Sequence, residues 1–257
     1  MTDSSGIAPD AVPGWTIRHV VETGSTNKDL IALAEAGAVA DRTVLYTDHQ
    51  TAGRGRLDRR WDAPAGTNLL ASILFTDPPD APTTLPQAVG RAALDAIEEL
   101  ADEDLESRLG LKWPNDLLLD DRKLSGVLSQ RAATSGAVVV GIGLNVGWAP
   151  DGAASLRGDL GLDVGPALVL DLLLGELSRI LDAGNVAANY RSRLSTLGSV
   201  VRVEMPGGAM MTGTAIDLDA DGRLVVERND LDADLDADHE RRRVTLDVGD
   251  IVHLRRG

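Results

Sequence analysis

The sequence predicts an α/β protein of the α+β kind, in which a larger mixed domain is followed by a small β-barrel. Two observations predict this. Between residues 15 and 197, strand-like segments with alternating apolar residues are interspersed with segments of helical periodicity. From residue 200 onward, five short strand-like segments with turn signals between them follow one another. We therefore expect a flexible tail at 1–14, a main domain at 15–197 and the barrel at 198–257.

The main domain divides into strands, helices and one hairpin-like segment. Strand patterns cover 15–22, 42–50, 67–75 and 137–146. Helical patterns cover 28–37, 85–101, 166–183 and 185–197, the first of them preceded by the cap-type residues Ser25-Thr26-Asn27. Residues 109–130 indicate a strand, a turn and a second strand, with Asp120-Asp121 at the tip.

Composition excludes several classes of protein. The chain has 257 residues with 40 acidic and 25 basic side chains, for a net charge of −15, and such a surface repels nucleic-acid backbones. It has no cysteine, which excludes disulfides and thiolate chemistry, and its four histidines form no zinc-hydrolase motif. The N-terminus lacks a signal-peptide pattern, and no apolar run approaches membrane-spanning length. We expect a cytoplasmic protein with no membrane contact.

The densest cationic segment is GRGRLDRRW at 53–61. It holds four arginines and one acid in nine residues, a local reversal of charge in an acidic chain. Guanidinium groups suit bidentate contacts to carboxylates or phosphates, and glycines let a backbone approach a ligand closely. By composition alone, the segment is equally an anion-binding site or a basic loop that is only solvated or contacts RNA.

Two further segments carry polar side chains in suggestive places. In KWPND at 112–116, Pro114 forces a turn that places Asn115 and Asp116 at a rim, and Lys123 follows on the returning strand. In GIGLNV at 141–146, Asn145 interrupts an apolar strand, so it must be hydrogen-bonded or face a ligand. The acidic segment 230–240 resembles a calcium loop only weakly, because it lacks the required Gly and Glu, and an acidic hairpin loop is the alternative.

Together these segments resemble the biotin protein ligases. The matching pieces are ETGSTNKDL, TDHQTAGRGRLDRRW, LKWPNDLLL with RKLSGVL, and VGIGLNV, in the family's order over roughly residues 16–148. The strands from 199 are similar to the family's small SH3-like domain. The resemblance implies a mixed-sheet catalytic domain of the biotin/lipoate ligase type. It also implies a reaction in which biotin and ATP form biotinyl-5′-AMP, and the biotinyl group then passes to one lysine of a biotin carboxyl carrier domain.

The resemblance also assigns residues to subsites. It implies that biotin is bound by Ser25, Thr26, Asn27, Gln50, Arg54, Gly55, Arg56, Lys123 and Gly126. It implies that ATP is bound by Arg56, Arg59, Trp61, Asn115, Asp116, Lys123 and Asn145, with Trp61 packed near the adenine. The catalytic set comprises Lys123, Arg54, Arg56 and Asp116, and Asp116 is also the candidate Mg²⁺ ligand.

The chemistry supports these cations independently. A carboxylate must approach an anionic phosphate, and two unit charges about 4 Å apart repel by about 4 kcal/mol at an effective dielectric near 20. Left uncompensated, that repulsion would slow the reaction by nearly three decades. Lys123, Arg54, Arg56 and Mg²⁺ are the cations expected to offset it. In the second step a neutral amine attacks the acyl carbon, and Asp116 is the candidate base.

Two departures from the family pattern and two alternatives remain. Asp58 replaces a usual glycine in the arginine loop, where its charge weakens the binding of phosphate by its arginine neighbours. Val127 replaces a more common isoleucine at little cost in stability.

The alternatives are a lipoate or octanoate ligase of the same fold, and a non-catalytic sensor of biotin or biotinyl-AMP, which only Asp58 favours.

Partners follow from the same resemblance. About 14 residues precede Trp15, too few for the helix-turn-helix that some members carry, so we expect no DNA-binding role. An exposed sheet face would allow a homodimer or the docking of a carrier domain.

Overall fold

The computed structural model describes residues 12–79, 81, 83–204, 208, 210–228, 243–247 and 250–253. Most of the expected tail and the acidic segment 230–240 lie outside these residues, so both expectations stay untested. Among the described residues, no helix combines the length and the apolar character needed to cross a membrane.

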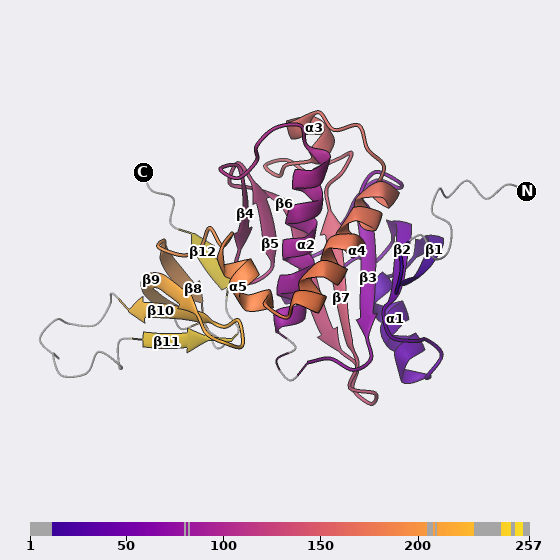
Figure 1. The fold of residues 1–257 in the computed structure, drawn as a ribbon, viewed down its shortest axis with the longest axis horizontal. Coiled ribbons are helices and arrows are strands. Elements are labelled where there is room, and N and C mark those ends of the chain that lie inside the picture. Colours follow the sequence, from indigo (N-terminus) through magenta and orange to yellow (C-terminus); the bar gives the residue numbers. More distant parts are fainter. Residues whose placement is uncertain are drawn as a thin grey trace, which may run out of the picture.

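The main domain is built on a seven-stranded mixed sheet (Figure 1). Only β1 and β2 pair in parallel, and the other neighbours are antiparallel. Across the sheet the strands are β1 (Thr16–Thr23), β2 (Thr43–Gln50), β3 (Leu69–Phe75), β7 (Val138–Leu144), β6 (Arg122–Arg131), β5 (Asp116–Leu119) and β4 (Leu109–Lys112). The expected mixed sheet is confirmed.

Helices cover both faces of this sheet. In Figure 1, α2 (Thr84–Leu100) and α4 (Pro166–Ala183) lie side by side across one face, followed by α5 (Val186–Arg191). On the other face, α1 (Thr26–Glu35) buries Leu30 and Ala34 against Leu45, Leu74 and Val139. Because successive side chains of a strand point to opposite faces, the strand residues next to these three pack into the larger core under α2 and α4.

The C-terminal unit is a five-stranded antiparallel sheet, as the sequence predicts. Its order is β11-β10-β9-β8-β12. The strands are β8 (Val200–Glu204), β9 (Met210–Leu218), β10 (Leu224–Arg228), β11 (Arg243–Leu246) and β12 (Asp250–His253). Alternate residues such as Val201, Val203 and Val226 are buried and continue the core of the main domain.

Three local predictions need correction. The helix expected at 185–197 ends at Arg191, because the edge strand β4 draws the following backbone into pairing: Leu111 N donates to Arg193 O, and Ser195 N donates to Leu111 O. Residues 109–130 form three strands with two turns, and the second turn has Asp120 and Asp121 at φ 49° and 60°. A short helix, α3 (Leu156–Leu160), was not expected.

A further correction concerns Ser25. It stands at the N-cap position of α1, but its side chain makes no capping hydrogen bond. Ser25 is buried and lines a pocket instead.

Candidate functional site

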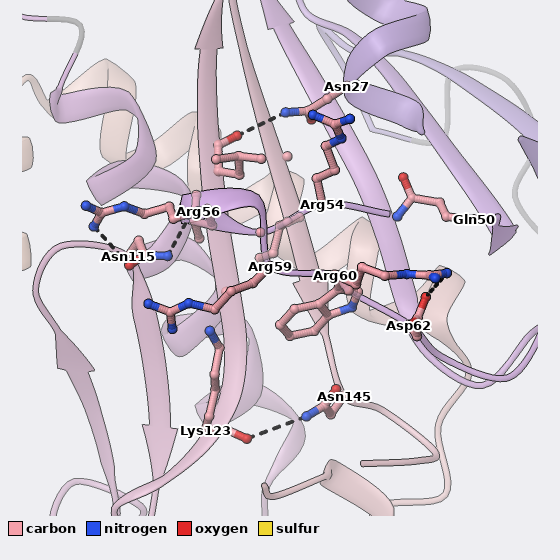
Figure 2. A pocket seen from close by; sticks show the side chains of 18 of the residues that line it. Asn27, Gln50, Arg54, Arg56, Arg59, Arg60, Asp62, Asn115, Lys123 and Asn145 are labelled. Atoms are coloured by element: carbon pink, nitrogen blue, oxygen red, sulfur yellow. Dashed lines mark hydrogen bonds and ion pairs between the residues drawn. The ribbon is translucent and has the colours of Figure 1, made fainter. Parts of the chain in front are cut away.

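One pocket of about 500 Å³ collects every residue that the sequence analysis places at a site. Its lining comes from the first turn of α1, the arginine loop (residues 53–61), the turn before β5, and strands β6 and β7 (Figure 2). The predicted residues found there are Ser25, Thr26, Asn27, Gln50, Arg54, Gly55, Arg56, Arg59, Trp61, Asn115, Asp116, Lys123, Gly126 and Asn145. Segments up to 120 residues apart in the chain thus meet in one place, while the subsite of each residue stays a prediction.

The floor of the pocket is made of glycines on two adjacent strands. Gly126 and Gly143 are directly paired across β6 and β7, and Gly141 lies two residues before Gly143 on the same face. A Cβ at Gly143 would collide with the Trp61 ring, and a Cβ at Gly141 would collide with the Asn27 amide. Only glycine lets these two side chains lie flat against the sheet.

The closed end of the pocket is a hydrogen-bonded cluster. The Thr26 backbone N–H donates to Gln50 Oε1 at 2.9 Å, and Thr26 Oγ1 lies 2.6 Å from Ser72 Oγ. Ser72 Oγ donates to Asn27 Oδ1 at 2.6 Å, and Asn27 Nδ2 donates to Gln130 Oε1 at 2.9 Å. Gln50, Ser72 and Gln130 lie on strands of the sheet, and Thr26 and Asn27 lie on α1, so these hydrogen bonds fix the side-chain orientations relative to one another.

The arginine loop closes the opposite side. Its ends are tied by Gly55 N donating to Arg59 O at 2.7 Å and by Trp61 N donating to Gly53 O at 3.1 Å. Leu57 at the tip has φ 55° and is 66% exposed. Leu57 is therefore the residue of the loop tip that takes the left-handed conformation.

Cations from the loop converge with Lys123. Figure 2 shows the side chains of Arg56 and Lys123 approaching Asn115 and the pocket from two sides, and Arg56 Nη1 donates to Asn115 Oδ1 at 3.4 Å. Lys123 Nζ lies 2.7 Å from Asp116 Oδ1 and 5.5 Å from the centroid of the Trp61 ring. Four arginines and one lysine line the pocket against two carboxylates, Asp62 and Asp116, so it is a local cationic site on an acidic protein.

Asp116 also affects the core behind the pocket. Tyr190 is fully buried, and its hydroxyl makes no hydrogen bond to the part of the chain that the structure describes. Burial, with a smaller contribution from the Asp116 carboxylate, raises the pKa of the Tyr190 phenol well above its ordinary value. Tyr190 therefore stays protonated and uncharged behind the site.

Asn145 proves to be hydrogen-bonded, one of the two possibilities for a polar residue in this strand. It is buried, donates to Ala154 O at 3.0 Å and accepts from Asn68 Nδ2 at 3.2 Å. Asn68 in turn accepts from the backbone N–H of Val146 and Trp148. This arrangement supports the loop that brings Trp148 to the pocket.

The residues at or near the site that the sequence did not assign to it include Asn68, Ser72 and Trp148. A usable signal existed for the first two, because each is a polar residue within the apolar segment 67–75. That same criterion singled out Asn145. No comparable signal marks Trp148, whose position depends on the loop after β7.

The described residues contain no group of three or more His, Asp or Glu side chains arranged to hold a metal ion. Asp116 is the carboxylate nearest the lysine in the pocket. One carboxylate is enough for Mg²⁺ when substrate phosphates supply further oxygen ligands. The donor set thus fits a metal that arrives with a nucleotide.

Two family models match the chain. Residues 23–146 match the biotin/lipoate A/B protein ligase family, and residues 196–254 match the biotin protein ligase C-terminal domain. The first range contains α1, α2 and strands β2 to β7, and the second contains strands β8 to β12.

Known proteins resemble the chain over most of its length. A biotin–[acetyl-CoA-carboxylase] ligase from Mycobacterium tuberculosis is 41% identical, over 94% of this chain and 91% of the relative. A bifunctional ligase/repressor BirA from Escherichia coli is 27% identical, over 84% of this chain and 70% of the relative. Among solved structures, a biotin protein ligase from Aquifex aeolicus in complex with biotin and ATP superimposes with a TM-score of 0.75 at 26% identity, covering 93% of this chain and 99% of the other.

Proposed function

The chain belongs to the biotin protein ligase family, and from that membership we propose that it is an ATP-dependent biotin protein ligase. It joins biotin to ATP, giving biotinyl-5′-AMP and pyrophosphate. It then transfers the biotinyl group to a specific lysine of a biotin carboxyl carrier domain. The observation that carries the proposal is a single pocket with a polar closed end, a glycine floor and a cationic opposite side.

The cationic side suits the first step. A carboxylate oxygen attacks the α-phosphorus, and the bond to the bridging oxygen of pyrophosphate breaks. Lys123, Arg54 and Arg56 all line the pocket, so they would offset the repulsion between the two anions and the charge that develops on phosphorus. The arginine loop also covers the pocket, which protects a water-labile mixed anhydride.

The nucleotide subsite follows from the remaining residues. Trp61 offers an aromatic face beside Lys123 for a purine, and Asn115 and Asp116 lie on the phosphate side. Mg²⁺ belongs to this proposal: Asp116, assisted by Asn115, would hold it, and when bound it would neutralise phosphate charge.

The second step needs a neutral amine. The lysine of the carrier attacks the acyl carbon, AMP leaves, and the ammonium proton must be taken up. Asp116 is a carboxylate in the pocket, 2.7 Å from Lys123 Nζ, and is the proposed base.

Biotin-dependent ATP–pyrophosphate exchange with purified protein and Mg²⁺ tests the first step, with lipoate as the parallel substrate. We expect exchange with biotin and none with lipoate. Exchange only with lipoate would assign the chain to the lipoate or octanoate branch. Biotin binding without exchange would identify a sensor, and restored exchange in Asp58→Gly would then locate the defect in the arginine loop.

Transfer is tested with an isolated biotin carboxyl carrier domain. We expect one biotin per carrier, and none on a carrier whose acceptor lysine is replaced by arginine. A homodimer, the lack of a DNA-binding role and a cytoplasmic location stay predictions.

A further inference from the structure

We propose that Ser72 is a positioning residue. It determines which groups at the closed end of the pocket donate hydrogen bonds and which accept them, so that the pocket selects a ring carrying both N–H and C=O groups. This inference rests on the proposed function, and it names the feature that separates a cyclic urea from the sulfur ring of lipoate. Ser72 lies on the central strand β3 and is 0% exposed. It acts through Thr26, while Asn27 fixes the direction of the Ser72 proton, and both residues line the pocket.

The direction of each hydrogen bond follows from Asn27. Its Nδ2 donates to Leu128 O at 3.2 Å and to Gln130 Oε1 at 2.9 Å. The amide oxygen is therefore the atom that faces Ser72, and an amide oxygen only accepts. Ser72 must give its single proton to Asn27, at 2.6 Å.

Ser72 can then only accept from Thr26. The Thr26 hydroxyl has two possible acceptors, Ser72 Oγ at 2.6 Å and Gln50 Oε1 at 3.2 Å. The shorter contact orients the Thr26 proton toward Ser72, because a hydroxyl carries one donor and two lone pairs. Thr26 is left with a lone pair for a ligand.

Gln50 provides the complementary group. Its Oε1 is held by the Thr26 backbone N–H at 2.9 Å, so its Nε2 is the end that remains for a ligand. Nε2 makes no hydrogen bond within the described part of the chain, and Gln50 lines the pocket. The closed end thus presents an acceptor on Thr26 and a donor on Gln50.

A cyclic urea matches this pair, since its N–H donates to Thr26 and its C=O accepts from Gln50. A dithiolane has no N–H donor, and its sulfurs are weak acceptors. A site built to hydrogen-bond a ligand rejects an analogue that leaves its polar groups unpaired. Ser72 therefore contributes to discrimination without touching the ligand.

Titration calorimetry with biotin on Ser72→Ala tests the inference. We expect the Kd for biotin to rise about tenfold, the effect of losing one oriented hydrogen bond, while the KM for ATP in the exchange reaction stays unchanged. Thr43→Val is the matched control: Thr43 is also buried in the sheet, but its hydroxyl donates to Ala40 O outside the pocket. An unchanged Kd in Ser72→Ala, or equal rises in both variants, would overturn the inference.

A double-mutant cycle separates positioning from general loosening. In a Thr26→Val background there is no hydroxyl to orient, so adding Ser72→Ala should leave the Kd for biotin where Thr26→Val put it. Additive effects would contradict the inference. Ser72→Cys replaces the hydroxyl with a slightly larger thiol that is a weaker donor. It should give an intermediate Kd, which maintains the test if the alanine variant does not fold.

Biotin binding by the wild-type protein separates a failure of the proposed function from a failure of the role of Ser72. A wild-type protein that binds no biotin overturns the proposed function and this inference with it. A wild-type protein that binds biotin while Ser72→Ala binds it equally well overturns the role of Ser72 alone.

Discussion

The indole Nε1 of Trp113 donates a hydrogen bond of 3.2 Å to the carbonyl oxygen of Gly222, which joins the turn beside the pocket to the β9–β10 turn of the C-terminal sheet. The amide of Gln87 donates to the same carbonyl at 2.7 Å. Trp113 stands two residues before Asn115 in the chain, so the C-terminal unit supports the segment that carries Asn115 and Asp116.

Trp113→Phe removes this hydrogen bond while keeping an aromatic ring. We expect the free energy of unfolding to fall by about 1–2 kcal/mol and the kcat of exchange to fall severalfold, because the turn loses a support. Trp15→Phe is the matched control: it loses an indole bond of 2.8 Å to Ser178, remote from the pocket, and should affect stability alone. Equal exchange in the two variants, measured beside urea unfolding, would show that the link to the C-terminal unit does not reach the pocket.

Lys123→Ala should reduce biotin-dependent exchange by two to three decades. In the proposed mechanism this lysine lies between the reacting carboxylate and the phosphate. Its loss would leave much of their repulsion, about 4 kcal/mol at an effective dielectric near 20, uncompensated. Lys28→Ala removes an exposed lysine on α1 and should leave exchange unchanged. Near-wild-type turnover of Lys123→Ala would refute the assigned role.

Gly143→Ala should cost at least a hundredfold in exchange. The new Cβ collides with the Trp61 ring, so Trp61 must leave the glycine floor and the pocket changes shape. Gly175→Ala is the comparison, since that helical glycine has open space around its Cα and alanine there should stabilise α4 by up to about 1 kcal/mol. Retained exchange in Gly143→Ala, together with an unchanged biotin Kd, would mean that Trp61 is free to move.

The pH dependence of stability offers a further test at Asp171. Burial raises the pKa of this carboxyl above 3.8, and its Oδ1 has no hydrogen-bond partner among the described residues. Its ionisation therefore destabilises the fold at pH values above the raised pKa, and this penalty vanishes below pH 3.8. Asp171→Asn should be more stable than wild type at pH 7, by a margin that shrinks to nothing as the pH falls through that range.

Asp217→Asn should show the opposite sign. A hydrogen bond from Arg191 lowers the pKa of the Asp217 carboxyl, so its charged form stabilises the fold above pH 3.8, and this stabilisation is lost as the pH falls through the lowered pKa. Urea unfolding across pH 3–8 compares both variants with wild type. Parallel pH curves for all three proteins would contradict the assignment.

The sequence by itself determined the family, most of the helices and strands, and many of the residues that line the pocket. Segments such as STN at 25–27, GRGR at 53–56 and KWPND at 112–116 are local signals, and α4 has the very bounds that its apolar periodicity predicts. These features depend on residue type and spacing along the chain, which a sequence displays directly.

Only the tertiary structure decided how those residues act on one another. Ser72 orients Thr26 from 46 residues away, and Gly222 supports Trp113 from 109 residues away. Helix α5 is shorter than its periodicity predicts, because an edge strand takes up the backbone that follows it. Hydrogen bonds and close contacts between distant segments have no periodic trace in a sequence, since they depend on which strands become neighbours after folding.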